Sequence, residues 1–208
     1  MTHQSLFGDT LVDLDDATHA LVRLSAALAS GSEDDVRAAL QQAMTPTPHA
    51  WIEELLLQTY LFAGFPRALN GMREWRRLAR TPAPGTMAAS DATAATGEET
   101  CARVYGGMYT RLRDNIAALH PRLDEWMINE GYGKVLSRPA LDLGRRELCI
   151  VAACAATGQD RQLQSHLHGA RNVGVPDTTI SATLASLQGV IPNETLERAT
   201  RLWTRIAA

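Results

Sequence analysis

One glutamate and one histidine in the C-terminal half of the sequence are placed to form an acid/base pair. Glu147 lies one or two turns into a predicted helix that otherwise consists largely of Leu, Ile, Val, Ala and Cys residues. A carboxylate in such a helix is usually paired or exposed. His166 lies on the next predicted helix, so a helical hairpin about Gly158 would bring the two side chains together. A carboxylate partner fixes the tautomer of an imidazole, which makes His166 a candidate proton donor or acceptor near neutral pH.

The same two residues can also be explained without any catalytic role. Glu147 follows two arginines and could simply be exposed, and His166 could be an ordinary core or surface histidine. His168 lies two positions from His166 and therefore faces another side of the helix, where we expect it to be solvated.

The composition favours an intracellular globular protein. The 208 residues are 45% hydrophobic and carry a formal net charge of -3, with no clustered basic patch of the kind that binds nucleic acid or an anionic membrane. No apolar run approaches the roughly 20 residues of a membrane span, so the cytoplasm is the expected location. Cys101, Cys149 and Cys154 form no C-x-x-C pair, which argues against a disulfide framework and against a zinc site.

Apolar periodicity and capping residues predict an all-α protein. Ser32 followed by Asp35 is a variant capping box, and Asp142 is a candidate N-cap. No convincing alternating strand pattern is present. The predicted helices cover 11–29, 33–43, 49–63, 66–80, 98–119 with an interruption at Gly106-Gly107, 121 to 131 or 133, 143–157, 161–172, 177–187 and 193–206.

The segment 81–97 is the best internal boundary of the chain. It is poor in large apolar residues and rich in Ala, Thr and Pro, which is typical of a linker. We therefore expect an N-terminal helical half at 1–80, a flexible linker at 81–97 and a C-terminal helical half at 98–208.

A weak internal repeat relates the two halves. An offset of 128 positions pairs Trp75 with Trp203 and lays the first long helix on the helix that carries Glu147. This suggests two degenerate copies of one multi-helix unit, although helical periodicity alone produces some such matches. At this offset Glu147 aligns with His19 and His166 with Ala38, so only the C-terminal copy keeps the acid/base pair.

Two blocks of the sequence resemble the carboxymuconolactone decarboxylase family. The first block contains Arg146-Glu147-Leu148, an Ala-rich run over 152–156, His166-Leu167 with Ala170, and Asn172 followed by Gly174-Val175. The second contains Glu53-Glu54, Tyr60, Gly64-Phe65-Pro66 and Ala68-Leu69-Asn70. The order of the blocks is reversed relative to ordinary members, as expected if a duplicated unit lost one block from each copy. The resemblance implies the AhpD-like helical fold and a homo-oligomer, such as a dimer, trimer or hexamer.

The resemblance also implies a role for the acid/base pair. In the decarboxylase branch, the histidine at the place of His166 is thought to protonate the carbanion left when carbon dioxide departs from a lactone acid, without metal or other cofactor. Glu147 would orient it. Tyr60 could line the substrate cavity, and Arg146 could anchor a substrate carboxylate, although a surface position beside Arg145 is favoured.

Two other functions stay open for a member of this family. The peroxidase branch uses a C-x-x-C pair, and Gln159 and Gln162 stand at those two places here, so peroxide reduction by that dithiol is not expected. A divergent peroxidase would need a lone cysteine, Cys149 or Cys154, which are more simply explained as small core residues. A non-enzymatic protein that binds a small molecule is the third possibility.

Overall fold

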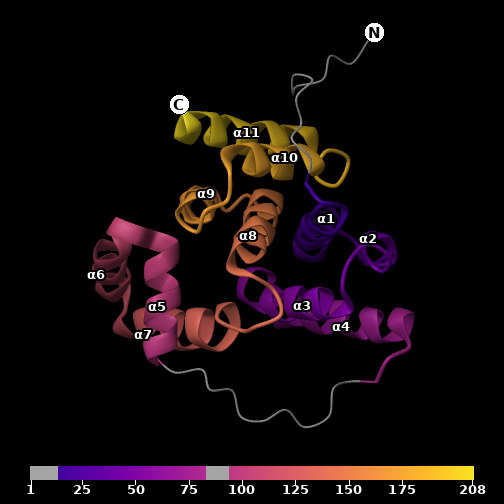
Figure 1. The fold of residues 1–208 in the computed structure, drawn as a ribbon, viewed down its shortest axis with the longest axis horizontal. Coiled ribbons are helices and arrows are strands. Elements are labelled where there is room, and N and C mark those ends of the chain that lie inside the picture. The colour runs from indigo at the N-terminus through magenta and orange to yellow at the C-terminus, as the bar shows by residue number, and fades with distance from the viewer. Residues whose placement is uncertain (1–13, 83–93) are drawn as a thin grey trace.

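The computed structural model describes residues 14–82 and 94–208, and every regular element named within them is a helix (Figure 1). The first four helices are α1 (Asp16–Ser30), α2 (Glu33–Ala43), α3 (His49–Ala63) and α4 (Phe65–Ala79). They are followed by α5 (Ala94–Tyr105), the 3₁₀ turn η1 (Gly106–Met108), α6 (Tyr109–Leu119), α7 (Pro121–Trp126) and the π-helix η2 (Met127–Leu136). The last four are α8 (Leu143–Thr157), α9 (Asp160–Asn172), α10 (Asp177–Ser186) and α11 (Asn193–Ala207). The predicted all-α class is confirmed.

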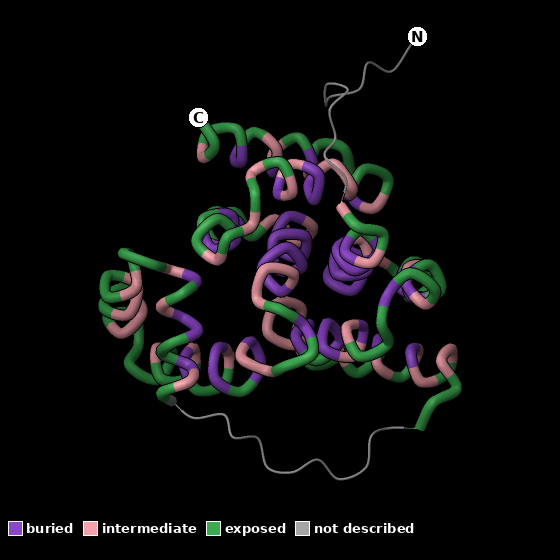
Figure 2. Tube along the Cα trace, in the orientation of Figure 1, coloured by how far each residue is buried: buried purple, intermediate pink, exposed green. Residues whose placement is uncertain are grey.

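Helix α8 is the centre of the molecule. It contacts α1, α3, α9, α10 and α11, and its residues 146–155 are all buried (Figure 2). From Leu148 to Ala156 the helix is apolar around its whole circumference, and such a helix belongs in the interior of a protein. The predicted N-cap is confirmed, because the Asp142 side chain accepts a hydrogen bond from the backbone nitrogen of Arg145 at 3.0 Å. Gly158 ends the helix with a φ of 70°, a left-handed conformation that favours glycine.

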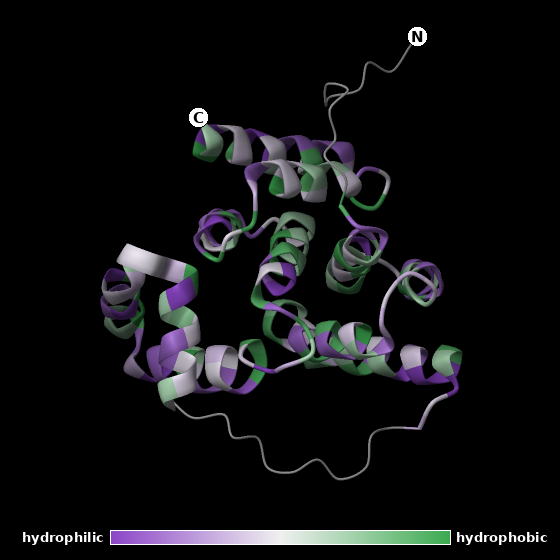
Figure 3. Ribbon diagram, in the orientation of Figure 1, coloured by the Kyte–Doolittle hydropathy of each residue, from purple (hydrophilic) through white to green (hydrophobic). Residues whose placement is uncertain are grey.

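The outer helices have two different faces. Helix α11 buries Leu196, Ala199, Leu202 and Trp203, while hydrophilic side chains occupy most of its other positions (Figure 3). The capping box predicted at Ser32 and Asp35 is present at the start of α2. Of the helices described, none combines the length and apolar character that crossing a bilayer requires.

Helices α1 to α4 and α8 to α11 form two units with matching contacts. With an offset of 128 positions, α4 and α11 share the same bounds, and α1 lies one residue out of step with α8. The two counterparts α1 and α8 pack directly against each other, and the contact of α1 with α10 matches that of α8 with α3. Trp75 donates to Glu53 Oε1 at 3.2 Å, and at the counterpart positions Trp203 donates to Ser181 Oγ at 2.8 Å.

Helix α5 begins inside the segment expected to be a linker. It starts at Ala94, three residues before the predicted end of the linker, while residues 83–93 lie outside the described part of the chain. The division into two halves and a linker stays a prediction. The small residues that indicated a linker allow a close approach instead. A Cβ atom at Gly97 would lie 2.3 Å from the carbonyl oxygen of Ile128 in η2.

The helix that begins at Pro121 is longer than predicted. It was expected to end at Gly131 or Gly133, but it continues beyond Trp126 as the π-helix η2 to Leu136. Packing explains the difference, because η2 lies against α5 and buries Ile128, Tyr132 and Val135. The two glycines stay within the helix, and Gly131 faces open space.

Candidate active site

The structure brings together the glutamate and the histidine that the sequence paired. His166 Nδ1 lies 2.8 Å from Glu147 Oε2, a normal hydrogen-bond distance. Helix α9 follows α8 after the turn at Gly158 and packs back along it, so the helical hairpin places His166 beside Glu147. Glu147 is fully buried and His166 is only 5% exposed. The alternative that Glu147 projects into solvent is therefore wrong.

The pair is closely packed on more than one side. Gly169, one turn after His166, makes this possible, because a Cβ atom there would lie 2.6 Å from Glu147 Oε2 and 2.8 Å from a methyl group of Val104 in α5. The ring of Phe62, from α3, meets the imidazole of His166 edge-on with centroids 5.6 Å apart. Helices α3, α5, α8 and α9 thus all contribute to the site.

One oxygen of the buried glutamate has no partner within the described residues. Oε2 of Glu147 binds His166, but Oε1 is buried without any hydrogen bond. Such a group is rare in native proteins and often belongs to a functional site.

Two tyrosines add polar groups near the glutamate. Tyr105 of α5 and Tyr132 of η2 have ring centroids 6.3 Å apart in a T-shaped arrangement. Burial raises the pKa of Tyr105 to about 12, and the charge of Glu147 acts in the same direction. Burial is also the main cause of a raised pKa for Tyr132. Both side chains are therefore uncharged phenols near neutral pH.

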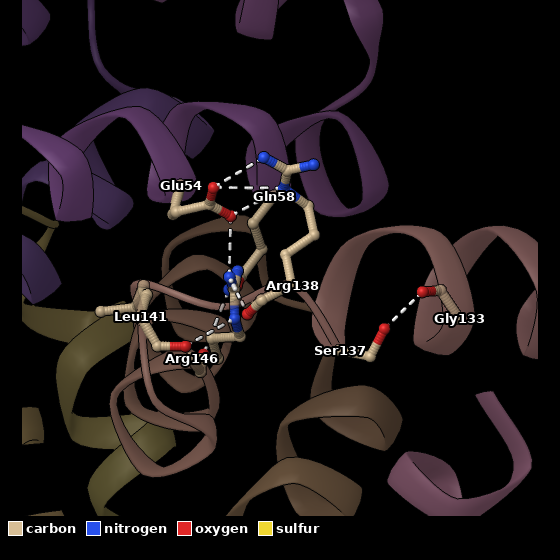
Figure 4. Close-up of polar contacts among 7 residues, drawn as sticks. All are labelled: Glu54, Gln58, Gly133, Ser137, Arg138, Leu141 and Arg146. Atoms are coloured by element: carbon tan, nitrogen blue, oxygen red, sulfur yellow. Dashed lines mark hydrogen bonds and ion pairs between the residues drawn. The ribbon is translucent and has the colours of Figure 1, made fainter. Parts of the chain in front are cut away.

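Arg146 is in the interior, so the surface position favoured from the sequence is wrong. Its side chain is fully buried, and its guanidinium donates to Glu54, Gln58 and two backbone carbonyls (Figure 4). A hollow of about 690 Å³ opens beside the loop that precedes α8, and Arg138 and Asp142 line it, whereas Arg146 does not. The donors of Arg146 thus bind protein oxygens, and its predicted contact with a substrate carboxylate stays untested.

Phe62 is the α3 residue whose ring contacts His166, and the predicted role of Tyr60 in lining a substrate cavity stays untested. The ring of Tyr60 packs against Phe65, with centroids 5.0 Å apart. Burial raises the pKa of its hydroxyl; on η2, the charge of Glu130 acts in the same direction and that of Lys134 in the opposite direction. Two residues along a helix are about 200° apart, so Tyr60 and Phe62 face different neighbours. The sequence does not reveal the contact of Phe62 with His166, because this contact depends on how α3 is rotated about its axis relative to α9.

The cysteines are poor nucleophiles in this structure. Cys149 and Cys154 are buried in α8, and burial raises the pKa of each thiol to about 12. Gln159 and Gln162 are exposed. Within residues 14–82 and 94–208, no group of three or more His, Cys, Asp or Glu side chains converges as metal ligands would.

Residues 121–203, which hold Glu147 and His166, match the model of the carboxymuconolactone decarboxylase family. The resemblance to this family predicted from the sequence is thereby confirmed over this part of the chain.

A relative is similar over most of the chain, including the first half. It is Peroxisomal protein 2 of Schizosaccharomyces pombe (strain 972 / ATCC 24843), which is 28% identical over 183 residues. The match covers 84% of this chain and 85% of that protein.

Proposed function

We propose that the protein is a decarboxylase or related lyase that acts on a small organic acid or lactone without a cofactor. The observation that carries the proposal is the buried hydrogen bond between Glu147 and His166, 2.8 Å long. The match of residues 121–203 to the carboxymuconolactone decarboxylase family supports the same class of reaction. In this reaction His166 is the proton donor and Glu147 is the residue that orients it.

The hydrogen bond assigns a role to each nitrogen of the imidazole. Nδ1 is occupied by Glu147 Oε2, so Nε2 is the nitrogen left for the substrate. When carbon dioxide departs, the electron pair of the broken C–C bond stays on the substrate carbon, and this carbon takes the proton of Nε2. His166 must therefore enter the step with both nitrogens protonated.

The direct test is turnover of carboxymuconolactone and related small acids, measured as release of carbon dioxide. We expect His166→Ala to lower kcat/KM by about 10² to 10⁴-fold, the usual contribution of a positioned general acid. Glu147→Gln keeps the shape of the side chain but loses its charge, so we expect a smaller loss. The matched control is His168→Ala, because His168 lies on the same helix and is exposed. If His166→Ala were as active as His168→Ala, the proposed role of His166 would be refuted.

Peroxide reduction by a lone cysteine is not favoured. The raised pKa values of Cys149 and Cys154 leave little thiolate at neutral pH, and the thiolate is the nucleophile in such chemistry. Alkylation of the cysteines tests this alternative: loss of a measurable peroxidase activity would revive it.

The molecular partners and the location are part of the proposal as well. Besides the small acid or lactone, we expect further copies of the chain in a homo-oligomer, because several large apolar side chains are exposed on the helices described. The cytoplasm is the location expected from the sequence, whereas the relative from Schizosaccharomyces pombe has a peroxisomal name. Imaging of a fluorescent fusion in cells would distinguish the two.

A further inference from the structure

Arg146 is an interior cation whose three guanidinium nitrogens are all engaged. Nε donates to the carbonyl of Leu141 at 3.1 Å, and Nη1 donates to Gln58 Oε1 at 3.2 Å. Nη2 donates to Glu54 Oε2 at 2.8 Å and to the carbonyl of Arg138 at 3.0 Å. Figure 4 shows these contacts between α3, the loop before α8 and the first turn of α8.

The partners of Arg146 are themselves held in place. Arg138 donates hydrogen bonds to both oxygens of Glu54, from Nη2 to Oε1 at 2.9 Å and from Nε to Oε2 at 3.0 Å. Gln58 returns a hydrogen bond, because its Nε2 donates to the carbonyl oxygen of Arg146 at 3.1 Å. That carbonyl belongs to the peptide group that joins Arg146 to Glu147. The cluster of Glu54, Gln58, Arg138 and Arg146 therefore holds the backbone on which the site glutamate is mounted.

Stability alone does not explain this cluster. Removing a cation and a carboxylate from water is costly, and well-packed apolar residues of similar volume often stabilise a protein as well or better. Here the burial is pronounced, since Arg146 is fully buried and Glu54 is only 6% exposed. A cluster of this kind points to a need for a defined geometry.

The other half of the molecule provides an internal comparison. At the offset of 128 positions, Arg146 corresponds to Thr18 and Glu54 corresponds to Ala182. The helices that carry these counterparts, α1 and α10, are in contact just as α8 and α3 are. The same helix contact thus forms without an ion pair at these positions. Only the half that has Glu147 and His166 also has the buried arginine.

We propose that Arg146 and Glu54 are positioning residues that fix the carboxylate of Glu147 against His166. Arg146 sets the rotation and the axial position of the first turn of α8, and Glu147 directly follows this turn. The tight fit of Oε2 over Gly169 leaves little room for error, because even a Cβ atom there would lie 2.6 Å away. The kinetic part of this inference rests on the proposed function. The structural part can be tested on the imidazole of His166 without any substrate.

The test is a double variant, Glu54→Leu with Arg146→Met, which removes both buried charges of the pair at once. Arg138 also loses its carboxylate, but its side chain is 21% exposed and can be solvated. The readout is the ¹⁵N NMR spectrum of the His166 imidazole, assigned by comparison with His166→Ala. We expect the variant to fold, as judged by circular dichroism, but to lose the single tautomer with a protonated Nδ1 bonded to Glu147. Where turnover is measurable, kcat should fall by up to about 100-fold with little change in KM, since a misplacement of about 1 Å has an effect of this size.

The matched control lies one residue away. Glu53 of α3 pairs with Arg76 of α4 at 2.6 Å. Glu53→Gln therefore also removes a carboxylate of α3 that pairs with an arginine. This pair links α3 to α4 and not to α8, and we expect the spectrum of His166 and the kinetics to stay as in the parent. A double variant that folds and keeps the parental His166 spectrum would overturn the inference.

A second variant covers the case in which the double variant does not fold. Arg146→Lys keeps the charge but lacks the planar fork of donors. We expect this variant of the parent to fold, with the imidazole of His166 present as a mixture of tautomers. A parental spectrum in this variant would contradict the inference. Failure of the proposed function has a different signature, since it would appear as equal activity of the parent and His166→Ala, whatever the spectra show.

Discussion

At the scale of single residues, Gly169 sets how closely the acid/base pair can pack. We expect Gly169→Ala to lower the free energy of unfolding by about 1–3 kcal/mol, the usual cost of forcing an extra carbon into a packed interior. The reason is the position of the new Cβ atom, 2.6 Å from Glu147 Oε2 and 2.8 Å from Val104. Urea denaturation measures the change.

The control for Gly169→Ala is Gly107→Ala. Gly107 lies in η1, and a Cβ atom there would meet nothing within 4 Å. We expect no loss of stability for this variant. Equal stability of both variants would show that Glu147 and Val104 can move aside without cost.

At the scale of elements, the contact between α2 and α4 should depend on pH. Glu74 of α4 accepts hydrogen bonds from Arg77 and from Arg37 of α2, the latter at 2.7 Å. The hydrogen bond from Arg77 is the main cause that lowers the pKa of Glu74 from 4.5 to about 2. A carboxylate with a lowered pKa in the folded state stabilises the protein fully above its ordinary pKa, and this contribution is lost as the pH falls toward the lowered value.

Glu74→Gln is the variant that reveals this dependence. It should be less stable than the parent at neutral pH, and the difference should shrink as the pH falls from 4.5 to about 2. Unfolding by urea at several pH values measures both proteins. A difference that does not change with pH would mean that the charge of Glu74 does not stabilise the folded protein.

Much of the element pattern could be predicted from the sequence. The bounds of α3 at His49 and Ala63 were predicted correctly, because Pro48 and Gly64 punctuate a clear apolar face. The pairing of Glu147 with His166 was also accessible, since a short turn joins their helices.

Other features depend on tertiary contacts and left no local signal. The burial of Arg146 could not be seen, because α8 is buried on all sides and its periodicity does not separate an inner face from an outer one. The π-helix η2 depends on packing against α5. The contact of Phe62 with His166 requires the relative phase of two helices that are distant in sequence.

At the scale of the whole molecule, exposed apolar side chains distinguish the first unit from the second. Leu57, Phe65 and Leu69 on α3 and α4 are 38%, 62% and 58% exposed. Their counterparts at the offset of 128 positions are Ala185, Asn193 and Glu197. The shared fold therefore does not require apolar residues at these places, which supports a contact between copies of the chain.

The counterpart residues themselves supply the test of this contact. We expect the parent to have a mass that is a multiple of 22.6 kDa in light scattering after size exclusion. Phe65→Asn with Leu69→Glu should shift it toward the monomer, with the circular dichroism spectrum unchanged. A monomeric parent, or a variant that assembles as the parent does, would exclude association through this face.

The direct contact between α1 and α8 has a consequence for stoichiometry. These helices are counterparts, so in a protein with a single unit the same contact would have to join two chains, and it would weaken on dilution. Here both units belong to one polypeptide, and the covalent connection holds them at a high effective concentration. A symmetric pair of chains would also contain two equivalent sites, whereas this chain has Glu147 and His166 in one unit only. A ligand of the site should therefore saturate at one molecule per chain at any protein concentration.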